Sequence, residues 1–239
     1  MQTATSAHVC TQNTPGEYIS GLPAWDRVPR LDAWLPHVLG ESPQSVGMNR
    51  MQYLTLVGRQ WLMGMVHRAQ EPGSKFDFTP VLQGPQGTGK SALLRTLVGK
   101  DFFSDDAGPM SWGKGRLEEM QEIWLYEINE LTAFRASELD GINAFIKSTT
   151  DSYRPPYSEK SEFFPRQFVV AVTTHNTALH KDRLGKRFWV VPVRNHINTQ
   201  WLREHRDQLF AEALARNNAG QNDHVLTLNY HPGNPLCDR

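Results

Sequence analysis

The fold class is indicated most clearly by the stretch Val81-Leu82-Gln83-Gly84-Pro85-Gln86-Gly87-Thr88-Gly89-Lys90-Ser91. Its glycines let the backbone turn tightly, and glycines followed by Lys-Ser are typical of a phosphate-binding loop between a strand and a helix. The flanks agree, because residues 76–82 are mostly apolar and β-prone, and apolar residues recur at helical spacing from 92 to 97. A chance glycine-rich turn before a helix is the alternative interpretation.

A loop of this kind predicts a nucleoside triphosphate, with ATP favoured, as the ligand. Backbone N–H groups and the helix N-terminus would face the phosphates, and Lys90 would bring charge to the β- and γ-phosphates. The Ser91 hydroxyl is expected to coordinate Mg²⁺. The residues expected to hold the nucleotide are Gly84, Pro85, Gln86, Gly87, Thr88, Gly89, Lys90, Ser91 and Ala92.

Composition sets broader limits on the chain. Its 239 residues can form one large domain or a core with helical additions, and Lys plus Arg equals Asp plus Glu at 25 each. Any DNA contact must therefore come from a local patch. Cys10 and Cys237 lie near opposite ends, which argues against a disulfide framework or a cysteine metal site. The sequence has no membrane-length apolar stretch and no signal-peptide pattern, so we expect a cytoplasmic protein.

The chain divides into four expected parts. Residues 1–20 read as a flexible tail, and 21–74 as an N-terminal helical subdomain with a long helix between 48 and 69. Residues 75–196 form the expected α/β core, a mainly parallel sheet flanked by helices, of the P-loop NTPase type resembling AAA+ proteins. Residues 197–239 supply a C-terminal helical lid or tail.

A second apolar strand, within residues 122–131, ends in acidic residues. A P-loop ATPase needs a carboxylate on a neighbouring strand for Mg²⁺ and a second acid or amide to orient the attacking water. We assign Glu127 to the metal, as in a Walker B strand, and Glu130 as the second acid. The sequence leaves this division of roles open, and solvated residues at a strand end are the alternative.

A third strand, within residues 166–176, is β-branched and ends in His175 and Asn176. In AAA+ and related ATPases, a polar residue at the tip of the strand between the two Walker strands contacts the γ-phosphate or the water. Either side chain could do this here, and Asn176 is preferred narrowly. A simple His-Asn turn is the alternative.

A basic turn follows and leads into another apolar strand, at 188–193. An arginine in this turn could stabilise transition-state charge in a neighbouring subunit as an arginine finger. Arg187 is the first choice and Arg183 the second, whereas a solvated surface arginine is the ordinary alternative.

Several motifs in this order resemble the virulence-associated protein E-like family, from about Trp25 to Ala213. They are Trp25-Asp26 with Pro29-Arg30-Leu31-Asp32, Glu71-Pro72-Gly73 with Lys75-Phe76-Asp77, the phosphate loop, Glu127 with Glu130, Tyr153-Arg154-Pro155-Pro156-Tyr157, Phe164-Pro165-Arg166-Gln167, Thr173-Thr174 and Arg187-Phe188-Trp189. The family usually reads Thr-Thr-Asn where this chain has Thr-Thr-His-Asn, so the sensor assignment stays open.

The resemblance implies a superfamily 3-like helicase within the AAA+-like ATPases, acting in replication of a phage or other mobile element in a bacterial host cell. It implies a homo-oligomer, with a hexamer favoured, and replication proteins as further partners. Many relatives carry a primase domain upstream, and only a short tail precedes the core here, so primer synthesis is not expected of this chain.

Such helicases grip single-stranded DNA with a hairpin between the second and third strands. The residues here expected to contact nucleic acid are Lys147, Arg154, Tyr157 and Lys160, since cations track phosphates and rings stack on bases. Bracing of the Pro155-Pro156 turn by Arg154 and the tyrosines is an equal alternative. A nucleotide-switched interaction protein and a small-molecule kinase are the rival functions.

Overall fold

The computed structural model describes residues 14–76, 78–105, 120–130, 136–154, 159–175 and 187–221, with the backbone alone for 136–139. The helices are α1 (Pro15–Ser20), α2 (Trp34–Val38), α3 (Pro43–Gln70), α4 (Lys90–Val98), η1 (Lys100–Phe102), α6 (Ala136–Lys147) and α8 (Thr199–Asn218). The strands are β1 (Thr79–Gln83), β2 (Phe103–Ser104), β3 (Leu125–Asn129), β4 (Thr150–Tyr153), β5 (Glu162–Pro165), β6 (Val169–Thr174) and β7 (Phe188–Pro192).

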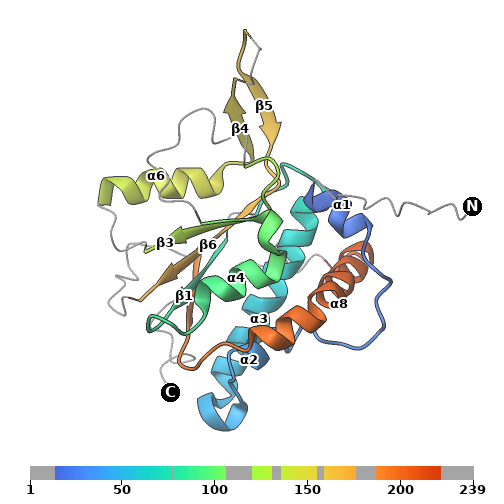
Figure 1. The fold of residues 1–239 in the computed structure, drawn as a ribbon, viewed down its shortest axis with the longest axis vertical. Helices are drawn as coiled ribbons and strands as arrows, with labels where there is room; N and C mark the ends of the chain where they lie inside the picture. The colour runs from blue at the N-terminus through green and yellow to red at the C-terminus, as the bar shows by residue number, and fades with distance from the viewer. Residues whose placement is uncertain are drawn as a thin grey trace, which may run out of the picture.

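A five-stranded parallel sheet forms the centre of the molecule, with strand order β2-β3-β6-β1-β7 (Figure 1). The third apolar strand of the sequence, β6, lies between the other two, pairing Val81 of β1 with Val172 and Ile128 of β3 with the same residue. All these strands run parallel, so their carboxyl ends meet at one edge. The expectation of a mainly parallel sheet flanked by helices is confirmed.

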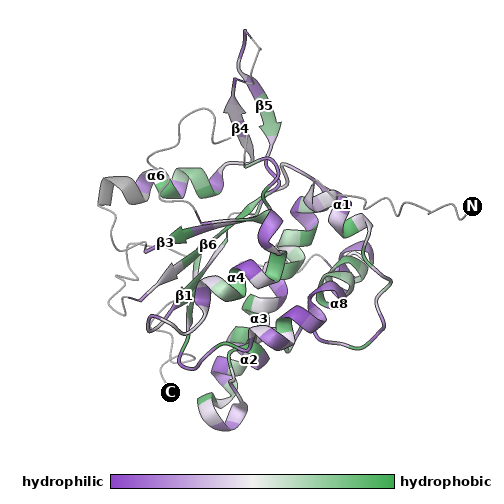
Figure 2. Cartoon of the chain, in the orientation of Figure 1, coloured by the Kyte–Doolittle hydropathy of each residue, from purple (hydrophilic) through white to green (hydrophobic). Residues whose placement is uncertain are grey.

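Helices cover both faces of this sheet (Figure 1). Alternate strand residues point to opposite faces, as in any strand, so Leu125 and Val169 enter one hydrophobic core while Tyr126 and Val170 enter another. The larger core also takes side chains from α1, α2, α3, α4 and α8, and the smaller one takes Ile142 and Ile146 of α6. Figure 2 shows the matching hydrophobic colour on the strands.

The long helix α3 confirms the helical stripe predicted between residues 48 and 69. It begins with a capping box at Ser42 and bends at Gly47, where φ is 75°. Its buried side chains share the larger core with α8, which lies beside it. The N-terminal helices and α8 therefore belong to the same packed unit as the sheet, rather than to subdomains with cores of their own.

The expected tail at residues 1–20 is wrong for its last part. Residues Pro15–Ser20 form α1, which starts with a capping box between Thr14 and Glu17. Tyr18 and Ile19 are buried, and the Tyr18 hydroxyl donates to Asp207 of α8 at 2.6 Å. A hydrophobic pair and one remote hydrogen bond thus hold a segment whose composition predicted mobility.

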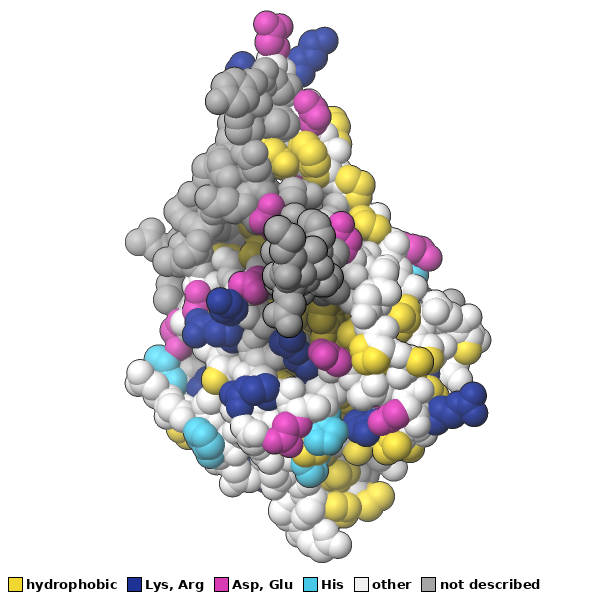
Figure 3. All heavy atoms as spheres, turned by 45° about the vertical axis from the view of Figure 1, so that its right-hand side comes forward, with side chains coloured by type: hydrophobic (Ala, Val, Ile, Leu, Met, Phe, Trp, Pro, Cys, Tyr) yellow, Lys and Arg dark blue, Asp and Glu magenta, His cyan; other side chains and the backbone are white. Residues whose placement is uncertain are grey.

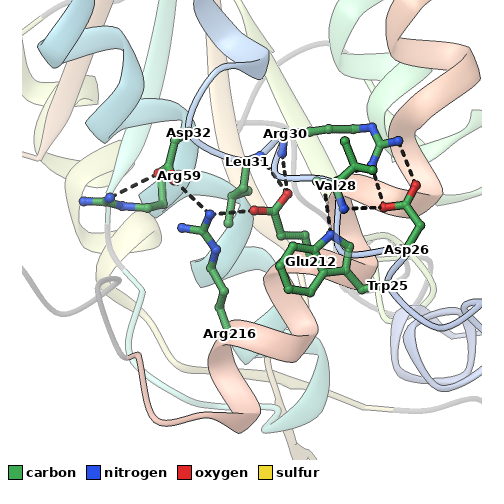
Figure 4. Close-up of polar contacts among 9 residues, drawn as sticks. All are labelled: Trp25, Asp26, Val28, Arg30, Leu31, Asp32, Arg59, Glu212 and Arg216. Atoms are coloured by element: carbon green, nitrogen blue, oxygen red, sulfur yellow. Dashed lines mark hydrogen bonds and ion pairs between the residues drawn. The ribbon is translucent and has the colours of Figure 1, made fainter.

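A polar cluster fastens the segment from Asp26 to Asp32 to α8 (Figure 4). Glu212 is fully buried and accepts hydrogen bonds from the backbone N–H groups of Arg30, at 2.6 Å, and Leu31, at 2.9 Å. Arg216 donates both to Glu212, at 2.5 Å, and to Asp32, at 2.8 Å. We call these residues, together with Arg59, which pairs with Asp32, the Glu212 cluster.

Strands β4 and β5 form a separate antiparallel hairpin that projects beyond α6 (Figure 1). At its base Arg166 is buried, forms a bidentate ion pair with Asp151, and lies against the rings of Phe145 and Phe168, 4.2 and 4.6 Å from their centroids. These contacts join the hairpin to the smaller core.

Within the described residues, no helix has the length and apolar character needed to cross a membrane.

Candidate functional site

The glycine-rich loop joins the end of β1 to the start of α4, as the sequence predicts. Gly89 adopts φ 94°, a left-handed conformation that favours glycine. A Cβ on Gly84 would lie 2.1 Å from the carbonyl oxygen of Val193, so only glycine fits where the loop passes β7. The loop is thus held in a compact turn, with the N-terminus of α4 directly behind it.

Lys90 folds back over the loop that precedes it. Its ammonium group donates to the carbonyl oxygens of Gly84, at 2.8 Å, and Pro85, at 2.7 Å. Partial burial lowers the pKa of Lys90, while the nearby carboxylates of Glu130 and Glu127 act to raise it. The ammonium group is therefore positioned over the loop, where an anion could replace the two carbonyl contacts.

Glu127 lies beneath the start of α4 and is fully buried. Its Oε1 accepts hydrogen bonds from the hydroxyls of Ser91, at 2.7 Å, and Thr173. Burial raises the pKa of Glu127, although the two hydroxyl hydrogen bonds lower it. The sequence placed Glu127 where its strand ends, and this is wrong: it lies in the middle of β3, two residues before the end.

Glu130 is the acid that follows the strand. It has a positive φ of 59°, an unusual backbone conformation for a residue with a side chain. The hydroxyl of Thr174 donates to its Oε1, and Nδ1 of His175 lies 2.5 Å from its Oε2. Two side chains at the carboxyl end of β6 therefore hold Glu130 at the carboxyl edge of the sheet.

A cavity of about 480 Å³ opens between the loop and these polar strand ends. Its lining residues are Gln86, Gly87, Gly89, Lys90, Ser91, Ala92, Asn129, Glu130, Thr173, Thr174 and His175. One wall carries backbone N–H groups and an ammonium group, and the opposite wall carries carboxylate, hydroxyl and imidazole groups. Such a site can take a ligand that carries negative charge at one end and reacts with water at the other.

Not every predicted residue joins this site. Asn176, Arg183 and Tyr157 lie outside the described residues. Arg187 lies at the opposite edge of the sheet, since its carbonyl accepts from the N–H of Thr79 at the start of β1. The strand separates it from the loop by roughly 13 Å, at 3.3 Å per residue. Arg187 therefore belongs to a different surface from the cavity in its own chain.

Three of the predicted nucleic-acid residues are described, and they lie at or near the projecting hairpin. Lys147, Arg154 and Lys160 are exposed. Figure 3 shows basic and acidic side chains together at the far end of the hairpin and hydrophobic side chains along its flank. Two other polar or aromatic residues of this stretch are not accessible to a ligand, because Tyr153 is buried and stacks on Phe164 and Arg166 is buried at the hairpin base. Phe163, in contrast, presents an exposed ring and is 75% accessible.

Sequence reasoning missed three residues of the cavity wall, Asn129, Thr173 and Thr174. The two threonines end β6 and contact Glu127 and Glu130, one each. The available signal was the predicted position of β6 between the other strands, since the ends of adjacent parallel strands lie side by side. Thr173 and Thr174, the polar pair that ends the central strand, were therefore candidates for the site together with His175 and Asn176.

These features define an α/β protein with a glycine-rich loop facing an acidic strand end across a cavity. Residues 19–231 match the model of the virulence-associated protein E-like domain. The chain belongs to this family. The resemblance inferred from the motifs is confirmed.

Solved structures share the fold at low sequence identity. The apo structure of the NrS-1 C-terminal region aligns with a TM-score of 0.57 and 11% identity, over 87% of this chain and 51% of that one. An A-form apo structure of the same region gives 0.53 and 12%, over 82% and 47%. This chain thus spans about half the length of those chains. No curated protein matches it.

Proposed function

We propose that this protein is a Mg²⁺-dependent ATPase of the AAA+-like P-loop class that moves along single-stranded DNA during replication of a phage or mobile element. One observation carries the nucleotide part: the Ser91 hydroxyl of the loop donates directly to the buried Glu127 of β3. A glycine-rich turn without a catalytic role does not need a buried carboxylate behind its final serine. This contact instead joins the two halves of a phosphate and metal site.

The residues of the cavity divide the work between them. The loop N–H groups and Lys90 bind the phosphates, with Lys90 exchanging its carbonyl partners for phosphate oxygens. Glu130 accepts a hydrogen bond from a water molecule and orients it toward the terminal phosphate. Thr174 and His175 hold Glu130 in place, and His175 or Asn176 contacts the terminal phosphate.

The residues present fit a magnesium ion. Glu127 Oε2 is buried and has no hydrogen-bond partner among the described residues, and the Ser91 hydroxyl lies against the other oxygen. Hydroxyl and carboxylate oxygens are the ligands that Mg²⁺ prefers. When bound, the ion neutralises charge on the β- and γ-phosphates. Ser91 would hold it directly and Glu127 through its water shell.

The DNA part of the proposal rests on the hairpin and on the family. Lys147, Arg154 and Lys160 are exposed cations near it, and Phe163 offers an exposed ring of the kind that stacks on bases. Tyr157 stays a candidate for the same role. A basic and aromatic projection that binds one strand, in a chain that hydrolyses ATP, is what a translocase needs.

Assembly completes the proposal. Arg187 lies too far along the sheet to reach its own cavity, so an arginine finger at this position has to act in a neighbouring subunit. We therefore propose a homo-oligomer, a hexamer by family resemblance, with replication proteins as further partners. Arg183 is the second candidate for the finger.

Two other functions use the same cavity. A nucleotide-switched interaction protein would bind ATP and assemble without DNA-stimulated turnover. A small-molecule kinase would transfer phosphate to a metabolite, and it needs a second substrate pocket beside the first. The paired acids Glu127 and Glu130 favour hydrolysis, because one serves the metal and one the water.

ATP hydrolysis by the purified protein, with and without single-stranded DNA at low salt, tests the proposal. We expect turnover that DNA stimulates and that Lys90→Ala abolishes, and stimulation that falls in Phe163→Ala while basal turnover persists. Turnover indifferent to DNA would overturn the motor function and favour the switch. No binding of ATP in the presence of Mg²⁺ would overturn the nucleotide site itself.

A further inference from the structure

The strand order places different strands on the two sides of β1 and of the loop that follows it. On one side of β1 lie β6 and β3, which carry Thr174, Glu130 and Glu127, the groups that face a terminal phosphate in the proposed function. On the other side lies β7. A nucleotide whose terminal phosphate points toward Glu130 must extend its nucleoside away from β6. The remaining direction leads toward the segment that joins β7 to α8.

This joining segment, residues 193–198, lies directly against the phosphate loop. The N–H of Val193 donates to the carbonyl of Gln83 at 2.6 Å, and the N–H of Ile197 donates to the carbonyl of Thr88 at 2.9 Å. A Cβ on Gly89 would lie 3.6 Å from Cβ of Ile197 and 3.9 Å from Cε1 of His196. The imidazole of His196 thus lies at the edge of the loop, and it is exposed.

More aromatic rings follow at the start of α8. The Trp201 ring stacks on His205, with centroids 4.4 Å apart, and meets His37 of α2 at 4.6 Å. The N–H of Asn198 donates to the carbonyl of Val38, which fixes the end of α2 beside this segment. His37 is exposed, and Trp201 and His205 are half-buried. We call His37, His196, Trp201 and His205 the histidine patch.

We infer that the histidine patch binds the base of the nucleotide, with the ring of His196 stacking on it, and that a purine is preferred. The inference rests on the proposed function. The opposite wall of the cavity is lined by carboxylate, hydroxyl and amide groups and by the imidazole of His175, whose Nδ1 lies 2.5 Å from Oε2 of Glu130. That ring is thus held beside the acid at the end where the terminal phosphate is proposed to lie. Aromatic rings stack on every base, and the larger purine covers more of the ring surface.

Calorimetric titration of the full chain with Mg²⁺ and two probes tests this inference. ADP carries a base, and inorganic tripolyphosphate carries the phosphate chain alone. We expect His196→Ala to weaken ADP binding by about tenfold, the loss of one stacking contact, and to leave tripolyphosphate binding unchanged. His196→Phe should restore ADP binding, because the ring is kept. His67→Ala, on the last turn of α3, is the matched histidine control and should change neither.

The outcomes separate the two proposals. Unchanged ADP binding by His196→Ala, or equal loss of both probes, would overturn the base site while leaving the phosphate site intact. Failure of the unsubstituted protein to bind either probe would overturn the proposed function, and the base site with it. Titration with CDP in place of ADP tests the purine preference, which equal affinities would overturn.

Discussion

Two buried glutamates in this chain, Glu212 and Glu127, have very different hydrogen-bond partners. Glu212 is surrounded by donors, with two backbone N–H groups and the guanidinium of Arg216. Glu127 is equally inaccessible, yet it has two hydroxyl donors on one oxygen, and no ion pair or second-oxygen partner among the described residues. A buried carboxylate with full compensation stabilises a fold, whereas one without it costs stability and indicates a site kept for a ligand.

The largest effect is expected at Glu130, the acid that follows the strand of Glu127. Glu130→Gln keeps the shape of the side chain and removes the carboxylate that we propose to orient water. We expect ATP hydrolysis to fall by roughly 10²- to 10⁴-fold while ATP binding persists. Steady-state turnover and calorimetric binding measure the two quantities. Turnover within a few fold of the unsubstituted protein would remove Glu130 from the reaction.

Glu212→Ala is expected to have the next largest effect, on folding alone. It leaves the N–H groups of Arg30 and Leu31 and the charge of Arg216 without their shared acceptor. The free energy of unfolding should fall by about 3 kcal/mol, as for other broken buried ion pairs. Urea unfolding followed by circular dichroism measures it. A loss under about 1 kcal/mol would mean that the Glu212 cluster does not fasten the N-terminal segment.

Glu127→Gln should behave in the opposite way. Removing a buried charge that lacks a cation should leave the free energy of unfolding unchanged or raise it by about 1 kcal/mol. The affinity for Mg²⁺-ATP should fall by roughly 10- to 100-fold, since a partner of the metal site is lost. The two glutamates would prove equivalent if Glu127→Gln destabilised the protein as much as Glu212→Ala does.

The smallest expected effect is the pH dependence of stability, compared between the unsubstituted protein and Glu127→Gln. The folded-state pKa of Glu127 is raised above the usual 4.5, so the folded protein holds this proton more tightly than the unfolded chain. Its contribution to stability is greatest below pH 4.5 and is lost as pH rises through the folded pKa. The stability difference between Glu127→Gln and the unsubstituted protein should therefore widen over that range. A difference that stays constant with pH would show that Glu127 has an ordinary pKa.

The sequence predicted those features that depend on local pattern. The glycine-rich loop between a strand and a helix, the long helix and the acid Glu130 after the second strand all follow from spacing within a few residues. The contact of Thr173 with Glu127 did not, because it depends on which strands are neighbours. The helical state of Pro15–Ser20 was missed because the expectation there came from composition. The capping box of Thr14 and Glu17 is a local signal, and the burial of Tyr18 and Ile19 and the hydrogen bond to α8 add to it.

The Glu212 cluster shows the same limit more clearly. Glu212 lies within an ordinary helical pattern, and the neighbouring residues in the sequence do not indicate that it is fully buried. Its partners Arg30 and Leu31 lie about 180 residues away in sequence. The Asp26 to Asp32 motif, one of those that carried the family resemblance, is therefore explained by its contacts with α8 and not by the cavity.

The strand order also fixes when the surroundings of the glycine-rich loop can form during synthesis. Strand β1 emerges early from the ribosome, but its two neighbours are β6 and β7, which end at Thr174 and Pro192. Until β6 has left the exit tunnel, the strand that leads into the loop has no lateral partner, and until β7 has left it has only one. Closing such long stretches of chain is slow compared with forming a helix. The cavity is thus among the last parts of the protein to be completed, and a nascent chain that ends before β6 lacks one of its walls.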